Sequence, residues 1–203
     1  MPIEIIDGEQ GTPEWNLHRI GSIGASSVSK IITSTGKASS QRKAYMYQMA
    51  AELMTGAKTE TYSNKHMEEG LEREEETINA FNFITGIKTR PVSLIKPGTN
   101  ARYHCSPDSI VVDKEEGLEV KSVIPATQVK YLDQNKLPTE YSLQCQFSLF
   151  VTGWKVWHFF SYHPDLPPLI IKVERNEDLI SKIKTAVWLF NREVDDLIER
   201  LKA

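Results

Sequence analysis

Three charged residues near the middle of the chain have the types and spacing of a hydrolytic site. Asp108 follows a proline, and Glu119 and Lys121 lie in the short apolar segment LEVK at 118–121. Side chains alternate along a strand, so Glu119 and Lys121 would share one face, and the apolar residues beside them would share the other. If the apolar run at 109–112 pairs with this segment around an acidic turn, Asp108 lies near Glu119.

The charges on this face need each other or a cation. Burial of an unpaired charge is costly, and two carboxylates a few ångströms apart repel unless a divalent metal lies between them. An ordinary salt bridge between Glu119 and Lys121, with a solvated Asp108, is one interpretation. The spacing D-x10-E-x-K after a proline resembles the pattern of PD-(D/E)xK metal-dependent nucleases, which is the other. The hairpin alone leaves both open.

The composition sets broad limits on the protein. Its 203 residues, 40% of them apolar, are enough for one good core, so we expect one domain over 1–203. Neither a membrane span nor a secretory signal is recognisable, and we expect a cytoplasmic protein. The only cysteines, Cys105 and Cys145, cannot form a four-thiolate metal or iron–sulfur site by themselves and are expected to be reduced. A net charge of −3 argues weakly against nucleic acid, although basic residues can gather locally.

Hydrophobic periodicity predicts the elements that would position these residues. Helices are expected at 24–33, 41–55, 64–85, 139–152 and 176–201, with Gly86 ending the third as a C-cap. Short β-branched segments separated by turns predict a strand meander over 87–122, and two further strands at 155–163 and 168–175. This order is typical of an α/β or α+β fold with a mixed central sheet.

Two of these helices carry polar residues of interest. The acids of the helix at 64–85 are expected to form mostly a solvated face. Gln144 and Gln146 lie close to the apolar stripe of the helix at 139–152, where a buried amide must find hydrogen-bond partners. An amide on the helix surface is the alternative for either one.

Five segments in order resemble the bacteriophage lambda exonuclease family, the YqaJ-like viral recombinase nucleases. They are EWNLHRIGSIGASSVSKII at 14–32, G-x-x-x-E at 70–74 running on to FNFITG, SPD at 106–108, LEVK at 118–121 and QCQFSLFVTG at 144–153. The resemblance covers nearly the whole chain. It implies a restriction-endonuclease-like α/β core with a mixed central sheet flanked by helices.

The resemblance also implies roles for the catalytic residues. Asp108 and Glu119 match the metal-binding carboxylates, and Lys121 matches the lysine that contacts the attacking water. Glu74 matches a helix-borne acid that is a further metal ligand. Gln146 matches the glutamine of the third nuclease motif, and Gln144 takes that role if the helix register differs by two. We expect Lys121 to orient the water, or to help deprotonate it if desolvation lowers the pKa of its ammonium group.

The resemblance further implies contacts to the end of the DNA. Arg19, Ser26 and Ser106 match a 5′-phosphate pocket, and such side chains donate hydrogen bonds to phosphate oxygens. From the bare sequence, Arg19 could equally be a surface charge, Ser26 a helix cap and Ser106 a turn residue. Met67 matches a wedge that separates the terminal base pair, although Glu69 stands where the lambda pattern has tryptophan.

The implied activity is 5′→3′ exonucleolytic hydrolysis of double-stranded DNA ends, giving 3′ overhangs for recombination. The oxygen donors suit Mg²⁺ or Mn²⁺, one or two per site. The resemblance implies a phage or prophage protein that acts as a homotrimer and supplies overhangs to a single-strand annealing protein. Two alternatives stay open: a related end-processing nuclease of different polarity, and a non-catalytic DNA-binding module on the same fold.

Overall fold

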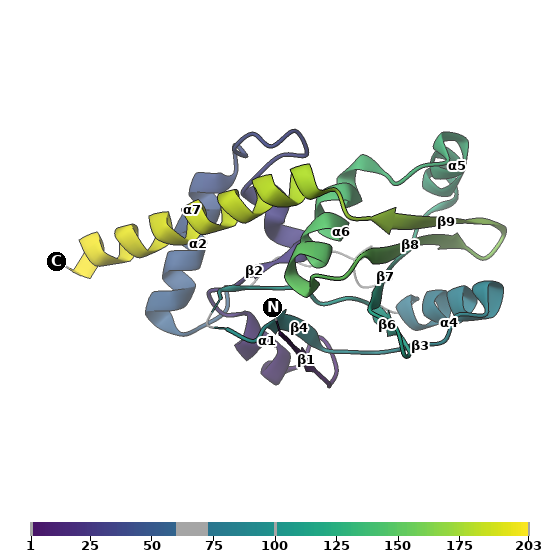
Figure 1. The fold of residues 1–203 in the computed structure, drawn as a ribbon, viewed down its shortest axis with the longest axis horizontal. Coiled ribbons are helices and arrows are strands. Elements are labelled where there is room, and N and C mark those ends of the chain that lie inside the picture. The colour runs from purple at the N-terminus through teal and green to yellow at the C-terminus, as the bar shows by residue number, and fades with distance from the viewer. Residues whose placement is uncertain (1, 60–72, 100, 203) are drawn as a thin grey trace.

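A five-stranded mixed sheet is the central element of the computed structural model, which describes residues 2–59, 73–99 and 101–202 (Figure 1). Its strands, in spatial order, are β3 (Thr89–Arg90), β6 (Ser109–Val111), β7 (Glu116–Ser122), β8 (Val156–His163) and β9 (Leu166–Glu174). The β7–β8 pair is parallel and the other pairs are antiparallel. The mixed sheet predicted from the sequence is therefore confirmed.

The β6–β7 hairpin forms as predicted. Ser109 lies opposite Leu118, and the amide of Asp108 donates to the Leu118 carbonyl at 3.1 Å. Gly117 allows β8 to pair closely with β7, because a Cβ at this position would lie 2.4 Å from the ring of Trp157. A larger residue there would push the two central strands apart.

The predicted single meander over 87–122 is wrong in its pairing. The strand β4 (Leu94–Pro97) pairs with β1 (Ile3–Ile6), and β5 (Tyr103–His104) pairs in parallel with β2 (Ile23–Gly24). The two N-terminal strands were not predicted. They take β4 and β5 out of the central sheet through contacts that are distant in sequence, which local periodicity does not report.

The helices agree with the prediction best where the apolar stripe is long. They are α1 (Pro13–Arg19), α2 (Arg42–Thr55), α4 (Glu74–Thr85), α5 (Pro125–Gln134), α6 (Thr139–Thr152) and α7 (Glu177–Lys202). The predicted helix at 24–33 is instead a 3₁₀ segment, η1 (Ala25–Lys30). It contains three serines, a residue type that is unfavourable in helix interiors because its hydroxyl can bond to the local backbone. The helix α5 was not predicted. Gly86 caps α4 with φ of 71°, as expected, whereas the predicted start of that helix at 64 lies outside the described residues.

Both faces of β7 are covered, and the two faces differ. Leu118 and Val120 pack with Phe81 of α4, while Phe159 of β8 packs into the larger core that includes Phe147 of α6. The predicted alternation along β7 is confirmed, since Glu119 points away from the α4 cluster. The cysteines of the chain are buried free thiols, as expected.

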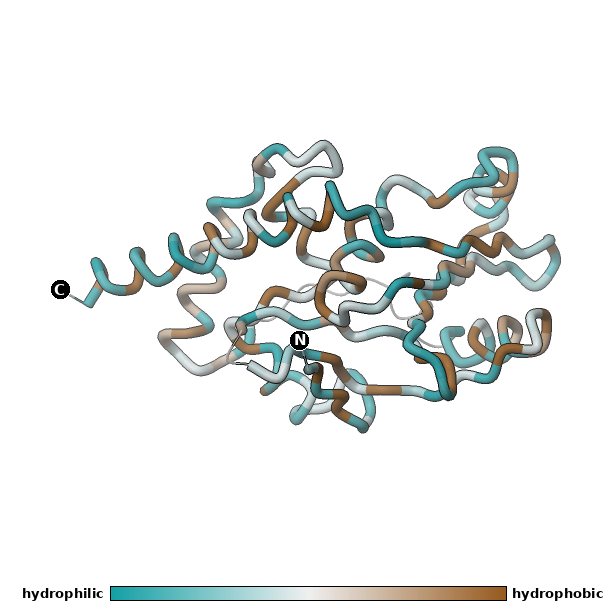
Figure 2. The backbone as a smooth tube through the Cα atoms, in the orientation of Figure 1, coloured by the Kyte–Doolittle hydropathy of each residue, from teal (hydrophilic) through white to brown (hydrophobic). Residues whose placement is uncertain are grey.

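The helix α7 runs across α2 at one end of the molecule (Figure 1). Its apolar residues alternate with charged ones (Figure 2), and the buried stripe consists of Ile180, Ile183, Val187, Phe190, Val194 and Leu197. In the described parts of the chain, no helix combines the length and apolarity needed to cross a bilayer.

Candidate active site

The β6–β7 hairpin brings Asp108 and Glu119 together. An Asp108 Oδ2 atom accepts a hydrogen bond from the backbone amide of Val120 at 2.6 Å. Glu119 is only 2% exposed, and its Oε1 accepts from Lys121 Nζ at 2.5 Å. Lys121 is half-buried and lies 5.5 Å from the ring centre of Tyr141. The two carboxylates and the ammonium group therefore form one cluster at the end of the hairpin.

The helix α6 adds a glutamine to this cluster. Gln144 Nε2 donates to Glu119 Oε1 at 2.6 Å. Gln146 lies elsewhere: its amide donates to the Glu174 carbonyl at 2.8 Å and accepts from the Asn176 amide at 2.9 Å. Residues two positions apart in a helix are separated by about 200° around its axis. The side chains of Gln144 and Gln146 therefore leave α6 on different faces. Gln144 therefore lies at the carboxylate cluster and Gln146 lies outside it, an arrangement that favours Gln144, the alternative register, for the glutamine of the third motif.

The carboxylates of this cluster perturb one another. Burial raises the pKa of Asp108 well above its ordinary value, and Glu119 and Glu74 raise it further. Burial also raises the pKa of Glu74, an effect that Glu119 strengthens and Lys121 opposes. Glu74, at the N-terminus of α4, therefore lies within electrostatic reach of Glu119 and Lys121.

Lys121 differs from the expectation of a lowered pKa. Burial lowers the pKa of Lys121, but the carboxylates of Glu119 and Asp108 outweigh that effect, so the net change is upward. This upward shift favours a role for Lys121 in orienting the water over a role as its base. Lys121 is an ammonium ion that can donate hydrogen bonds and orient a neighbour.

The donor set fits a hard divalent cation. Within the described ranges, no group of three or more histidine, cysteine or carboxylate side chains converges as a ready-made cage. Mg²⁺ does not require one, because it usually keeps several waters and binds one or two carboxylates together with substrate phosphates. Burial raises the pKa of Asp108 most, and the neighbouring carboxylates of Glu119 and Glu74 add to it; a divalent cation bound here would relieve the repulsion between these carboxylates.

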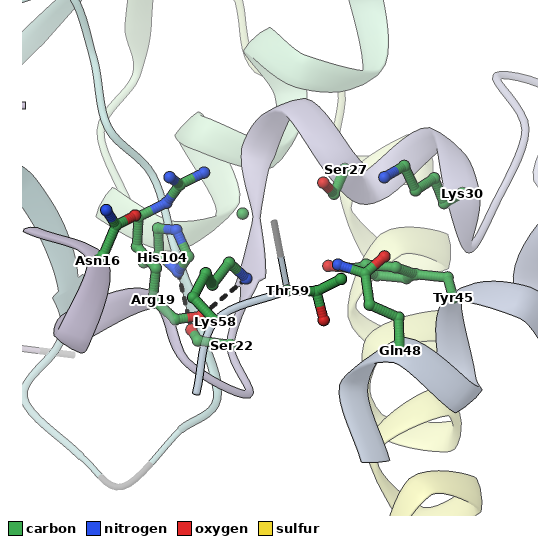
Figure 3. A pocket seen from close by; sticks show the side chains of 11 residues that line it. Asn16, Arg19, Ser22, Ser27, Lys30, Tyr45, Gln48, Lys58, Thr59 and His104 are labelled. Carbon is green, nitrogen blue, oxygen red and sulfur yellow. Dashed lines mark hydrogen bonds between the residues drawn. The ribbon is translucent and has the colours of Figure 1, made fainter. Parts of the chain in front are cut away.

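A second polar site is a cavity of about 410 Å³, which is lined by residues that precede the hairpin in the sequence. Figure 3 shows Arg19, Lys58 and His104 on one side of it, with Lys30, Tyr45 and Gln48 on the other. The remaining lining residues are Asn16, Ser22, Gly24, Ser27 and Thr59. Among the described residues that line it are three cationic side chains and no carboxylate, in a chain with more acids than bases. The cavity is therefore suited to an anion.

Arg19 is the one residue of the predicted phosphate pocket that lines this cavity. Its guanidinium carbon lies 3.6 Å from the ring centre of Trp15, whose Nε1 donates to Ser106 Oγ at 3.1 Å. Ser106 therefore supports Arg19 from behind through the indole ring. Ser26 is exposed on η1, and its neighbour Ser27 lines the cavity instead. The predicted wedge, Met67, lies outside the described residues.

One short segment of the chain connects the cavity to the carboxylate cluster. His104 lines the cavity, and Asp108 follows four residues later. Four residues of fully extended chain span at most about 14 Å. An anion in the cavity and a group at the carboxylates can therefore belong to neighbouring parts of one molecule.

Comparison with known proteins places the chain in a family. The sequence model of the YqaJ-like viral recombinase domain matches residues 14–155, more than half of the chain. The chain belongs to the YqaJ-like viral recombinase family. No curated protein sequence matches it.

Solved structures agree with this family assignment. An alkaline exonuclease from Laribacter hongkongensis is similar, with 30% identity and a TM-score of 0.83 over 94% of this chain and 96% of that one. The same exonuclease in complex with dAMP has 31% identity, with the same TM-score and coverage. A phage-related exonuclease from Haemophilus somnus 129PT has 18% identity and a TM-score of 0.65 over 89% and 96% of the two chains, which shows a shared fold.

Sequence reasoning missed most of the cavity of this YqaJ-family protein. Lys58, Gln48 and Tyr45 belong to α2 and the segment after it, where no motif marks them. Trp15 and His104 lie inside the quoted resemblance and its flanks, but their roles depend on contacts with Arg19 and Ser22. A glutamine or tryptophan reports little about its partners until the fold is known.

The two glutamines of α6 give a matched pair of variants. We expect Gln144→Ala to lower the nuclease rate about tenfold or more, because a hydrogen bond to a charged group contributes about 1.5–3 kcal/mol. Gln146→Ala should instead lower the free energy of unfolding by about 1–3 kcal/mol, because it leaves two backbone groups without partners. Initial rates and urea unfolding of both variants test this. Rate loss confined to Gln146→Ala would reverse the assignment.

His104 should make the YqaJ-family fold sensitive to acid. Burial, together with the nearby charges of Arg19, Lys58 and His18, lowers the pKa of His104 to about 3. Below pH 6.5 the unfolded chain binds a proton at this histidine that the folded protein does not bind. The free energy of unfolding therefore decreases as the pH is lowered. Between pH 7.5 and 5.5 this one group should remove about 1.4 kcal/mol.

The acid effect is isolated by comparison with His104→Gln. Other titrating groups are the same in both proteins, so the wild type should lose about 1.4 kcal/mol more than the variant over that interval. Urea unfolding at the two pH values measures the difference. Equal losses would show that His104 is protonated equally in the folded and unfolded states.

Proposed function

We propose that this protein is a metal-dependent 5′→3′ exonuclease that hydrolyses double-stranded DNA from its ends and leaves 3′ single-stranded overhangs. The observation that carries the proposal is the buried Glu119, held by Lys121 and Gln144 beside Asp108. Membership of the YqaJ-like family and the similarity to alkaline exonucleases support a nuclease. The cationic cavity close to this cluster supports a DNA end as the substrate.

In this proposal, Asp108 and Glu119 hold Mg²⁺ or Mn²⁺, one or two ions per site, and Glu74 is a further ligand. A bound divalent cation lowers the pKa of a water and neutralises charge that develops on the phosphate. Gln144 and Lys121 both donate to Glu119, and they fix the direction of its carboxylate. The ammonium group of Lys121 has further protons, with which it orients the attacking water.

We propose that the cavity receives the 5′-terminal phosphate, with Arg19 as its main cation. The stack on Trp15 fixes the plane of the guanidinium group, and the Nε atom is buried without a hydrogen-bond partner among the described residues. The remaining guanidinium donors suit phosphate oxygens. Ser27 lines the cavity in place of Ser26, while Ser106 acts through Trp15. The relative from Laribacter hongkongensis was solved with dAMP, a nucleotide of a size that such a cavity admits.

The assembly and partners follow the family resemblance. We propose that the whole chain, 1–203, forms one exonuclease domain, works as a homotrimer in a bacterial cytoplasm, and hands 3′ overhangs to a single-strand annealing protein. Exposed apolar residues on α7, such as Trp188 and Leu189, support an interaction surface.

Light scattering of the purified protein tests the assembly. We expect a mass three times that of the 23.1 kDa chain at working concentration. The measurement is made on protein whose nuclease rate is known. A stable monomer with full activity would rule out the trimer.

End-labelled duplexes separate this function from its alternatives. Linear DNA labelled on either strand end, with a 5′-phosphate or a 5′-hydroxyl, is digested in Mg²⁺ or in EDTA. Early release of the 5′ label in Mg²⁺ alone, faster from phosphorylated ends, is expected. Early release of the 3′ label would indicate a nuclease of different polarity. Binding without release would indicate a non-catalytic module.

A further inference from the structure

Glu52 is a buried carboxylate directly behind the wall of the cationic cavity. It lies on α2 and is 0% exposed. One oxygen, Oε2, accepts from Lys58 Nζ at 2.8 Å and from the Gly21 amide at 3.1 Å. The other, Oε1, accepts from Gln48 Nε2 at 3.0 Å and from the Thr59 amide at 3.3 Å. Four hydrogen bonds thus satisfy a carboxylate that has no contact with solvent.

These partners connect Glu52 to the cavity. Lys58, Gln48 and Thr59 all line it, and Gly21 forms the turn between the lining residues Arg19 and Ser22. Burial raises the pKa of Glu52, but the hydrogen bonds from Lys58, Gln48 and Gly21 outweigh it and leave the pKa below its ordinary value. Glu52 is therefore ionised at neutral pH, and it holds three separate segments of the wall together.

Among the described residues, the ammonium group of Lys58 has two hydrogen-bond acceptors. Nζ donates to Glu52 Oε2 and, at 3.3 Å, to the carbonyl oxygen of Arg19. An ammonium group has three donors, so these two acceptors in the described part of the chain leave one donor for a ligand. The side chain is 23% exposed while Glu52 is fully covered, so the accessible part of this ion pair is its positive end.

We propose that Lys58 is a second phosphate-binding cation of this cavity and that Glu52 is the positioning residue that holds Lys58 and the Arg19 turn in place. The ligand would be the terminal phosphate of a DNA strand, bound between the ammonium group of Lys58 and the guanidinium group of Arg19. The inference rests on the proposed function of the cavity. It extends that function, because neither Lys58 nor Glu52 belongs to the motif resemblance.

The test measures binding without cleavage. Short hairpin duplexes with one open end, carrying a 5′-phosphate or a 5′-hydroxyl, are titrated in EDTA by fluorescence anisotropy. The quantity of interest is the ratio of the two dissociation constants. Lys58→Ala should reduce the preference for phosphate about tenfold, which corresponds to about 1.4 kcal/mol. Lys58→Arg should retain most of it, because the positive charge is kept.

The positioning role has its own variant. Glu52→Gln keeps the shape of the side chain and removes its charge, and we expect it to reduce the same ratio severalfold while the hydroxyl end binds as before. General damage to the fold would weaken both ends alike. Lys172→Ala, which removes an exposed lysine of β9 that does not line the cavity, is the matched control and should leave the ratio unchanged.

The outcomes distinguish this inference from the function on which it rests. If the wild type does not prefer phosphorylated ends, both the phosphate cavity and the role of Lys58 are wrong. If the wild type has the preference and Arg19→Ala loses it, but Lys58→Ala keeps it, only the present inference is overturned. If Glu52→Gln does not fold, the two Lys58 variants still decide the role of the lysine, and Glu52→Asp tests the position of the carboxylate by the same ratio.

Discussion

Replacement of Asp108, Glu119 or Lys121 is expected to abolish or nearly abolish nuclease activity. Asp108→Asn and Glu119→Gln remove the charges that would hold a divalent cation, and Lys121→Ala removes the ammonium group beside Glu119. A metal centre contributes several kcal/mol of transition-state stabilisation, and each 1.36 kcal/mol is tenfold in rate, so losses of about a thousandfold or more are expected. The measurement is the initial rate of nucleotide release from a linear duplex in Mg²⁺.

The same variants should leave the fold intact. Asp108 has a raised pKa in the folded protein, so its ionisation costs stability at neutral pH. Asp108→Asn keeps an acceptor for the Val120 amide and removes this cost, so without metal it should unfold at a temperature equal to or above that of the wild type. The rate losses should also be non-additive, because these groups act as a unit. Substantial activity in each single variant, with loss only in the double variant, would contradict the assignment.

Arg19→Ala is expected to remove the preference for phosphorylated ends. A 5′-phosphate carries nearly two negative charges at neutral pH, and a hydrogen bond to a charged group contributes about 1.5–3 kcal/mol. Use of phosphorylated ends should therefore fall by about ten- to a hundredfold. Ends with a hydroxyl group should change much less, because they never make the contact. The ratio of initial rates on the two ends is the quantity to measure.

Arg19→Lys is the matched comparison for this prediction. Lysine keeps the charge but loses the planar fork and the stack on Trp15, so an intermediate ratio is expected. If Arg19→Ala slows both ends by the same factor, the arginine supports the fold or general DNA binding, and the phosphate assignment is wrong.

The hairpin was the part of the site that could be predicted best from sequence. Its geometry depends on the period-two alternation of one strand and on one turn, both of which are local. The choice between Gln144 and Gln146 was harder, because both lie near the apolar stripe of α6. Their hydrogen bonds to Glu119 and to Glu174 decide between them, and these partners are distant in sequence.

The cavity could be predicted only in part, for the same reason. Arg19 was found through a motif, but Lys58 lies in a segment without one. Its role depends on Glu52, a carboxylate of α2 that is fully buried in the fold. The prediction of strand pairing failed for the same reason, because β4 and β5 pair with strands near the N-terminus that are distant in sequence. Contacts between distant segments, rather than local propensities, created the features that sequence reasoning missed.

Digestion of linear and closed circular duplex DNA of the same sequence tests the central claim most directly. The wild-type protein is incubated with each form in Mg²⁺ and in EDTA, and acid-soluble nucleotides are counted over time. The account predicts steady release from linear DNA in Mg²⁺, none in EDTA, and none from the closed circle in either condition, because hydrolysis begins at an end. Release from the circle, release in EDTA, or no release from linear DNA in Mg²⁺ would contradict it.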